Sequence, residues 1–488
     1  MAASLRFRLG GPVVAVAGVA AVAAAVRLPG TFSQALSQDE VASARILREP
    51  GVLSMLSRVA RTESTPPLWY SLGWVLHRVG ASIVDVRLLS VLAGAGLAGC
   101  VVAAGRRVVP LSAAVVAGLL VAVGGELVAH GHELRSYELL AFLTALFALL
   151  LLRELEEPRP RTEITIGVVV GLGGLTHYFF AFAVVAAIGW LWLDPGAVRV
   201  RRRATIGILA GGLVAAAWAP VMLVQYHRNR FWWIGAFRLR SVVAVPLRLF
   251  TTAYADRAPG LALSVLFVAA VAAACIRMGR VGPSGRLVAA LALGPLAVAA
   301  ALWGAGFEIF ALRNLIEIAP TVAIAVVALL TSVPERVAVV AGLALVSAIG
   351  ASTLRQEGAG TPPFAQIAHA LVREGWRPSD PVAVLGNLFV FRAPLEWYLP
   401  HASVLDAGRP MRRVCRTVFV VSPRRSSELE FGRVTDRDAA GRYVVSRLSL
   451  RVPLGTERVF HRAAILVDPV DPSRCVRAIR TGRLAPIT

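Results

Sequence analysis

Lysine is absent from this 488-residue chain, in which all 51 basic residues are arginines. Its absence excludes catalysis through a lysine Schiff base or a lysine general base. Charged residues make up only 16% of the chain, whereas a soluble domain has about 25%. Four cysteines are too few and too scattered for a zinc motif. These shortages exclude a disordered chain, a disulfide-rich secreted scaffold and an ordinary cytosolic enzyme.

Hydrophobic residues dominate instead, at 57% of the chain with a mean hydropathy of +0.67. A membrane-spanning helix needs about 20 mostly apolar residues, and the chain offers many such segments. They cover residues 12–28, 84–104, 110–128, 139–152, 164–193, 204–224, 261–276, 287–306, 315–331 and 337–353. The sequence therefore predicts an all-α, polytopic membrane protein.

The net charge of +22 helps to orient these segments, because arginine gathers in short cytoplasmic loops. With the N-terminus inside, the arginines near residues 106, 153–161 and 199–203 all lie inside only if residues 164–193 cross twice. Two short helices meeting near Thr176-His177-Tyr178 would satisfy this condition. We expect about eleven spans, with the N-terminus inside and the C-terminus outside. The first span is expected to be retained, because Arg27 and Pro29 replace the small residues of a signal cleavage site.

The last part of the chain, residues 354–488, is predicted to be a separate extracytoplasmic domain beside a membrane domain of residues 1–353. An amphipathic helix pattern at 364–372 precedes strand-like runs at 382–385, 417–421 and 463–467, which indicates a small α/β fold. Cys415 and Cys475 both lie there, and the sequence leaves open whether they form a disulfide. The region holds 21 arginines against 12 acidic residues, a net charge of about +9.

Polar residues gather at the predicted outer ends of the spans, where burying an ionisable group is costly. Asp39 and Glu40 follow the first span, where an acidic pair can serve as a general base, a metal ligand or a helix cap. Trp69 and Tyr70 lie further along the predicted outer segment of roughly residues 29–83, the first outer segment, and suit a membrane interface.

A short segment between two predicted spans is unusually polar and can be a solvated loop or a metal site. Glu126, His130 and His132 are candidate ligands for a divalent cation, and Glu133 lies beside them. A strand would place both histidines on one face, whereas a helix would not.

Two later positions belong to the same outer face. His177 marks the break between the two short helices, where it could bond a freed backbone group or face an outward cavity. Arg313 lies at the outer end of a later span, where an arginine can extend to the interface or hold an anionic headgroup. The convergence of all these groups predicts one polar site on the outer face.

The order of these motifs resembles the bacterial GT-C glycosyltransferases of the mannosyltransferase and aminoarabinose-transferase type. Asp39-Glu40, the run from Thr65 to Tyr70, and Arg87-Leu88-Leu89-Ser90 come first. Glu133-Leu134-Arg135-Ser136-Tyr137, Thr176-His177-Tyr178 and the run from Arg313 to Pro320 follow. The resemblance covers roughly residues 10–335, and Leu395-Glu396-Trp397-Tyr398-Leu399-Pro400 also looks like the periplasmic extension of such proteins.

The resemblance implies transfer of a sugar, with inversion, from a polyprenyl-phosphate donor to a lipid, glycan or protein acceptor on the outer face. It implies no nucleotide cofactor and no nucleic-acid partner, and it leaves a divalent metal open. Asp39 would be the catalytic base with Glu40 beside it, and Glu133, or alternatively Glu126, would be the second-loop acid. Arg135 and Arg313 would hold the donor phosphate. The pocket residues would be Tyr70, Tyr137 and His177.

Two other classes of protein share some of these features. A polytopic transporter would carry polar residues within its spans and show repeat symmetry, whereas these spans are nearly free of charge. A non-catalytic membrane scaffold could use the basic C-terminal region to bind an anionic cell-envelope polymer. Donor consumption by the purified protein separates the three hypotheses.

Overall fold

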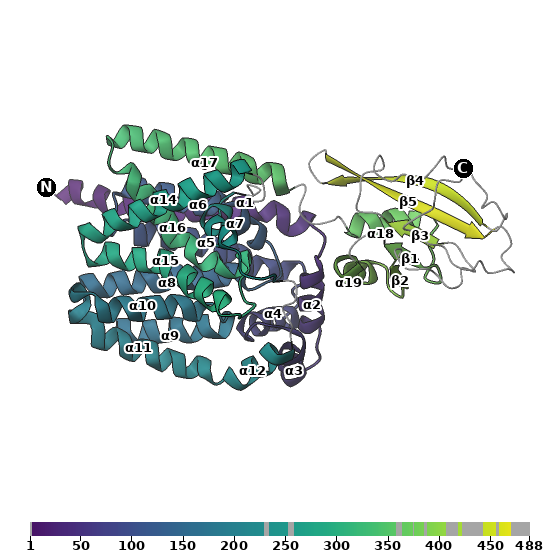
Figure 1. Cartoon of the computed structure of the whole chain (residues 1–488), viewed down its shortest axis with the longest axis horizontal. Helices are drawn as coiled ribbons and strands as arrows, with labels where there is room; N and C mark the ends of the chain where they lie inside the picture. The colour runs from purple at the N-terminus through teal and green to yellow at the C-terminus, as the bar shows by residue number, and fades with distance from the viewer. Residues whose placement is uncertain are drawn as a thin grey trace. The chain divides into compact units, whose positions relative to one another are not determined.

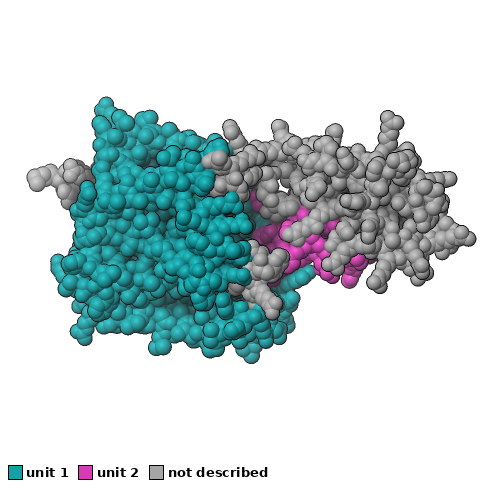
Figure 2. Space-filling view, viewed as in Figure 1, with its two compact units in different colours: residues 1–32, 45–357 teal, residues 33–44, 358–488 magenta. Residues whose placement is uncertain are grey.

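The computed structural model describes residues 2–228, 234–251, 258–357, 364–373, 375–384, 388–406, 418–421, 443–454 and 458–469. They form two compact units, residues 1–32 with 45–357 and residues 33–44 with 358–488 (Figure 2).

The regular secondary structure described in the first unit is helical (Figure 1). Its first half contains α1 (Ala2–Ser33), α2 (Gln38–Leu47, which begins in the second unit), α3 (Val52–Thr62), α4 (Leu68–Arg78), η1 (Asp85–Arg87), α5 (Leu88–Gly105), α6 (Leu111–Val123), α7 (Gly125–His130), α8 (Tyr137–Glu156) and α9 (Pro160–Thr176). Its second half contains α10 (Phe180–Leu193), η2 (Pro195–Ala197), α11 (Val198–Ala216), α12 (Ala219–Arg228), α13 (Leu239–Arg248), α14 (Ala258–Val281), α15 (Pro283–Gly304), η3 (Leu312–Ile318), α16 (Ala319–Leu330) and α17 (Glu335–Glu357).

Within the described residues, six helical segments are long and apolar enough to cross a membrane. The number rises to seven if residues 180–193 and 195–216, which are bent by 93° at their junction, count as one span. α6 is apolar but shorter, at 13 residues. The multi-pass character of the chain is therefore confirmed, and the count of eleven spans stays a prediction.

The break expected within residues 164–193 is present. α9 ends at Thr176 and α10 begins at Phe180, so that His177, Tyr178 and Phe179 connect two separate helices. The backbone N–H of His177 still donates to the carbonyl of Gly173 at 3.0 Å, which closes the last turn of α9. The break places His177 at a helix end within the first unit.

Glycines bring α9 and α11 into close contact. A Cβ atom added at Gly211 would lie 2.1 Å from the carbonyl oxygen of Gly167, and one added at Gly207 would lie 2.5 Å from that of Glu163. Gly167 and Gly171 on α9, like Gly207 and Gly211 on α11, are four residues apart and share a helix face. Small residues at this spacing allow helices to pack backbone to backbone in a membrane.

The second unit contains α18 (Phe364–Arg373), β1 (Val382–Val384), α19 (Leu388–Tyr398), β2 (Val404–Asp406), β3 (Val418–Val421), β4 (Tyr443–Leu454) and β5 (Arg458–Pro469). Its strands form a mixed sheet in the order β2-β1-β3-β5-β4. β1 pairs in parallel with β2 and β3, and β5 pairs antiparallel with β3 and β4.

The amphipathic pattern at 364–372 forms α18 as expected, and its apolar face is buried with β1 and α19 in one core. The predicted runs at 382–385, 417–421 and 463–467 overlap β1, β3 and β5, whereas α19, β2 and β4 were not anticipated. Ala35 joins the same core, and the backbone N–H of Leu36 donates to the hydroxyl of Tyr398 at 2.8 Å. Cys415 and Cys475 lie outside the described residues.

Candidate functional site

Residues 131–136 connect α7 to α8, and their backbone is held from several sides. Ser90 on α5 donates its hydroxyl to the carbonyl of Glu133 at 2.8 Å and to that of Arg135 at 3.3 Å. Gly131 must lack a side chain, because an added Cβ would lie 2.2 Å from Nε of Arg27. The glycine between the two histidines therefore makes room for an arginine from α1.

That arginine forms a buried ion pair beneath the loop. Arg27 donates to Oε1 of Glu138 from Nε at 3.1 Å and from Nη2 at 2.7 Å, and both side chains are fully buried. Nη1 of Arg27 also donates to the carbonyls of Ala23 and Ala122, at 3.0 and 2.9 Å. A buried charge is tolerated when it is paired and hydrogen-bonded, so the pair joins α1, α6 and α8 at one end of α8.

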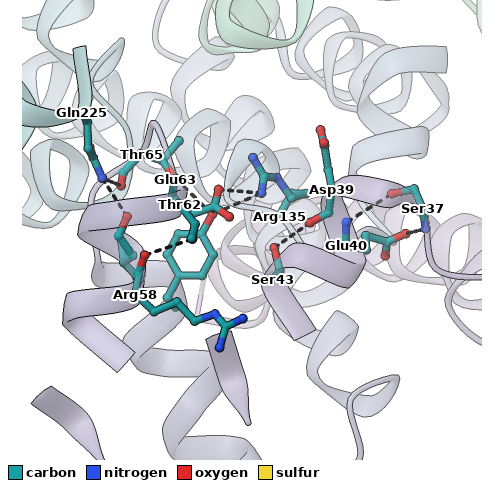
Figure 3. Close-up of polar contacts among 12 residues, drawn as sticks. Ser37, Asp39, Glu40, Ser43, Arg58, Thr62, Glu63, Thr65, Arg135 and Gln225 are labelled. Carbon is teal, nitrogen blue, oxygen red and sulfur yellow. Dashed lines mark hydrogen bonds and ion pairs between the residues drawn. The ribbon is translucent and has the colours of Figure 1, made fainter. Parts of the chain in front are cut away.

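Arg135 is fixed by two partners from the first outer segment (Figure 3). Its Nη1 donates to Oε2 of Glu63 at 3.0 Å and to the hydroxyl of Tyr70 at 3.2 Å. The same hydroxyl donates to Oε2 of Glu63 at 2.8 Å. Burial holds the pKa of Tyr70 well above its usual value, so the phenol remains protonated.

These contacts change two of the expectations for this segment. Trp69 and Tyr70 are buried against protein inside the first unit rather than exposed on its surface, because α4 packs its first turn inward. The hydroxyl of Tyr70 is engaged by Glu63 and Arg135, so its visible role is to hold the arginine. Glu63 was missed by the sequence analysis, and its position three residues before Pro66-Pro67 was the only available signal.

Gln225 on α12 fastens the same segment to the helix break. Its Nε2 donates to the carbonyl of Val59 at 3.0 Å, and its Oε1 accepts from the hydroxyl of Tyr178 at 2.5 Å. The side chain is buried. The first outer segment and the α9–α10 break are thus joined through one amide.

Arg135 and Arg313 converge on the ring of Tyr137. Their guanidinium carbons lie 5.7 and 5.8 Å from the ring centroid. The ring of His177 lies 5.7 Å from that of Tyr137, and its Nδ1 accepts the backbone N–H of Phe179 at 3.3 Å. A ring nitrogen that accepts a hydrogen bond carries no proton. The guanidinium groups of Arg135 and Arg313, beside a neutral His177, form a cationic site suited to phosphate.

His130, which precedes Tyr137 in the sequence, lies between two carboxylates. Its Nδ1 is 2.7 Å from Oε2 of Glu133 and its Nε2 is 3.5 Å from Oε2 of Glu126. Burial alone would lower the pKa of His130, but these two carboxylates hold it well above its usual value. Burial alone would raise the pKa of Glu133, but His130, His132 and Arg135 lower it to about 2. The pair is therefore ionised at neutral pH.

His132 is buried and packs against α1, where a Cβ added at Gly30 would lie 2.7 Å from its Nδ1. Burial lowers the pKa of His132 to about 4. In the part of the chain that the structure describes, no group of three His, Cys, Asp or Glu residues is arranged to hold a metal ion. The candidate ligands Glu126, His130 and His132 thus do not form a ligand set, because His130 is taken up by ion pairs.

Asp39 and Glu40 lie in the first turn of α2, within the second unit. Oε2 of Glu40 accepts the backbone N–H of Ser37 at 2.9 Å, and Oγ of Ser37 accepts the backbone N–H of Glu40 at 3.4 Å (Figure 3). This reciprocal pair is a capping box. The structure therefore gives buried Glu40 a cap role, while Asp39 is only partly buried.

Within the first unit, the structure brings together Arg135, Tyr137, His177 and Arg313, and Tyr70 is hydrogen-bonded to Arg135. Glu133 joins this region through the electrostatic influence of Arg135. Residues that the sequence analysis did not assign to the site, Glu63, Arg27 and Glu138, hold the site in place.

The chain is similar to known membrane glycosyltransferases. Residues 64–224 match the family model of dolichyl-phosphate-mannose-protein mannosyltransferases. Among solved structures, apo ArnT from Cupriavidus metallidurans is similar at a TM-score of 0.53 and 14% identity, over 97% of this chain and 99% of that one. The Archaeoglobus fulgidus oligosaccharyltransferase is similar at a TM-score of 0.50 and 13% identity, over 80% of this chain and 62% of that one.

No curated protein sequence matches the chain. The matches that do occur confirm the resemblance to GT-C membrane glycosyltransferases of the mannosyltransferase and ArnT type. The fold is theirs, although the family model covers only about a third of the chain.

Proposed function

We propose that the chain is an integral-membrane glycosyltransferase that moves a sugar from a polyprenyl-phosphate donor to a lipid, glycan or protein acceptor on the outer face of the plasma membrane. The observation that carries the proposal is the convergence of Arg135 and Arg313 on Tyr137. Arginine binds phosphate oxygens through a planar pair of donors. A solved structure of the same ArnT holds undecaprenyl phosphate, which is the class of carrier that the sequence resemblance implies.

In the proposed reaction, Asp39 accepts the proton of the acceptor hydroxyl. The hydroxyl oxygen then forms a bond to the anomeric carbon while the bond from that carbon to the phosphate oxygen breaks. Attack opposite the leaving group inverts the anomeric configuration. Arg135 and Arg313 stabilise the charge that develops on the departing polyprenyl phosphate.

The electrostatics of the first unit favour a phosphate over a neutral ligand. Glu63 pairs with Arg135, and Arg313 adds a second cation beside Tyr137. His177 is neutral and so does not add a third. A divalent metal is not required for the step as proposed, since the arginines supply the positive charge.

The Asp39→Asn variant tests the catalytic assignment. We expect transfer to fall by at least about 100-fold with unchanged expression, because general-base catalysis contributes about 10²–10⁴-fold. The readout is the movement of labelled sugar from polyprenyl phosphate into an envelope lipid and glycan extract.

Glu396→Gln is the matched control, because Glu396 is an acidic residue of the same unit that pairs with Arg392 on the surface of α19. It should leave transfer unchanged. Transfer by Asp39→Asn at the wild-type rate would remove Asp39 from the mechanism. A transporter or scaffold would leave the donor intact in every variant.

A further inference from the structure

A cavity lies in the first unit, lined by other residues than the cluster around Tyr137. Its volume is about 380 Å³, at the lower end of the roughly 300–1,000 Å³ of small-molecule sites. It is bounded by residues 234–236, α13, the end of α15 and the start of η3. The proposed reaction, as described above, makes no use of it.

One wall of the cavity is aromatic. Trp303 and Phe310 stack with ring centroids 4.5 Å apart and an angle of 10° between their planes. The indole N–H of Trp303 donates to the carbonyl of Gly235 at 3.0 Å, which fixes the ring and leaves no polar atom of the indole unsatisfied. Both residues line the cavity and are largely buried. A rigid apolar wall of this kind suits the C–H face of a sugar ring.

The remaining lining is cationic and polar. Arg238, at the N-cap of α13, and Arg248, at its last residue, both line the cavity together with Ser241. Both arginines are exposed, and no other residue in the described parts of the chain pairs with either of them. Among the described residues that line the cavity, none is acidic. Unpaired guanidinium groups on a cavity rim favour an anion.

We propose that this cavity binds an anionic saccharide, one bearing a phosphate or carboxylate group, and that it is the acceptor subsite. The aromatic wall would pack against the sugar ring, and Arg238 and Arg248 would bind the anionic group. The acceptor assignment rests on the proposed function, whereas the ligand class rests on the cavity alone. Leu312, which lines the cavity, is the immediate neighbour of Arg313.

Saturation-transfer NMR on the purified full-length chain tests the ligand class. Mannose 6-phosphate is the probe, and mannose is the neutral comparison. We expect the wild-type protein to transfer saturation to mannose 6-phosphate. In the Arg238→Gln/Arg248→Gln double variant, this saturation-transfer signal should fall by at least about fivefold. Mannose should give a weaker signal that the double substitution does not change, because it lacks the anionic group.

Arg240→Gln is the matched control, because Arg240 is exposed on the same helix but does not line the cavity. It should behave as wild type, and since all three arginines are exposed, none of these variants should impair folding. The proposal would be overturned if wild type gave no signal for mannose 6-phosphate, or if wild type and the double variant gave equal signals.

A second arm separates this proposal from the proposed function. In transfer assays the double variant should show a raised KM for the acceptor extract and an unchanged KM for the donor. A raised donor KM alone would contradict the acceptor assignment. Sugar binding in a chain that transfers nothing would leave the cavity as a saccharide site and remove the proposed function instead.

Discussion

At the scale of single residues, the site depends on how one arginine is held. Arg135 has little freedom, because Glu63 and Tyr70 both bond its Nη1 group. Preorganised donors stabilise developing charge without reorganising during the reaction. Glu63 is therefore expected to act through Arg135 as a positioning residue.

Replacement of Glu63 by glutamine tests this role. Hydrogen bonds to charged groups contribute about 1.5–3 kcal/mol, so a loosened Arg135 should raise the KM for the polyprenyl-phosphate donor by about 10-fold or more. The KM for the acceptor should not change, whereas a general loss of structure would impair the binding of both substrates. Glu49→Gln, which removes a carboxylate paired with Arg58 in the same outer segment, should leave both constants at wild-type values. Equal donor constants for Glu63→Gln and wild type would refute the role.

His130 gives the region a defined pH dependence. Because Glu133 and Glu126 raise its pKa in the folded state, its charge stabilises the fold fully below the unfolded pKa of about 6.5. This stabilisation is lost as the pH rises through the raised value. The melting temperature of wild type should thus fall by a few degrees more than that of His130→Gln between pH 6.5 and alkaline pH.

Exposed His369 on α18 supplies the control for this series. His369→Gln should follow the wild-type curve throughout. Parallel curves for wild type and His130→Gln would show that the ion pairs of His130 contribute nothing to stability. At the acidic end, the low pKa of Glu133 predicts a further loss of stability as the pH falls from about 4.5 towards 2.

The proximity of several residues could be predicted from motifs in the sequence. Arg135, Tyr137, His177 and Arg313 were predicted because their order along the chain is distinctive, and the structure brings them together. The role of Glu63 depends on a contact across 72 positions of the chain, which no local pattern encodes. The metal hypothesis was weakened for a related reason, because His130 found carboxylate partners within three and four residues.

At the scale of elements, the helix that ends at the His177 break packs closely on a neighbouring helix. α9, which ends at that break, touches α11 through glycines, and an added Cβ at Gly211 would meet both Gly167 and Gly171. The distribution of arginines predicted the break between α9 and α10 correctly. It did not predict that α9 would pack so closely on α11. Apolar periodicity cannot rank neighbours when nearly every face of a helix is apolar.

Gly211→Ala should therefore be strongly destabilising for its size. Overpacking a close contact costs about 1–3 kcal/mol, and we expect the melting temperature in detergent to fall by several degrees. Gly212→Ala is the control on the same helix, since nothing lies within 4 Å of an added Cβ there. It should be neutral or slightly stabilising because alanine favours helix. Equal melting temperatures for the two variants would contradict the packing described here.

At the scale of the whole molecule, composition indicated the class and the fold followed it. The small fraction of charged residues and the many apolar runs predicted a polytopic helical protein, and the similarity to ArnT confirms that fold. The number of spans was harder to predict, because charges near the ends of α8 and α9 blur the hydropathy signal that separates spans. The arginines behind the net charge of +22 lie in loops, in the second unit and, for Arg135 and Arg313, beside Tyr137.

The central claim is that the chain consumes a polyprenyl-phosphate sugar. The most direct measurement follows a donor labelled in both sugar and lipid, incubated with purified wild-type protein and an envelope lipid and glycan extract. We predict that free polyprenyl phosphate and glycosylated acceptor appear in equal amounts, and that the Arg135→Gln/Arg313→Gln variant forms neither. A donor that stays intact with wild type, or that the double variant consumes equally fast, would contradict the account.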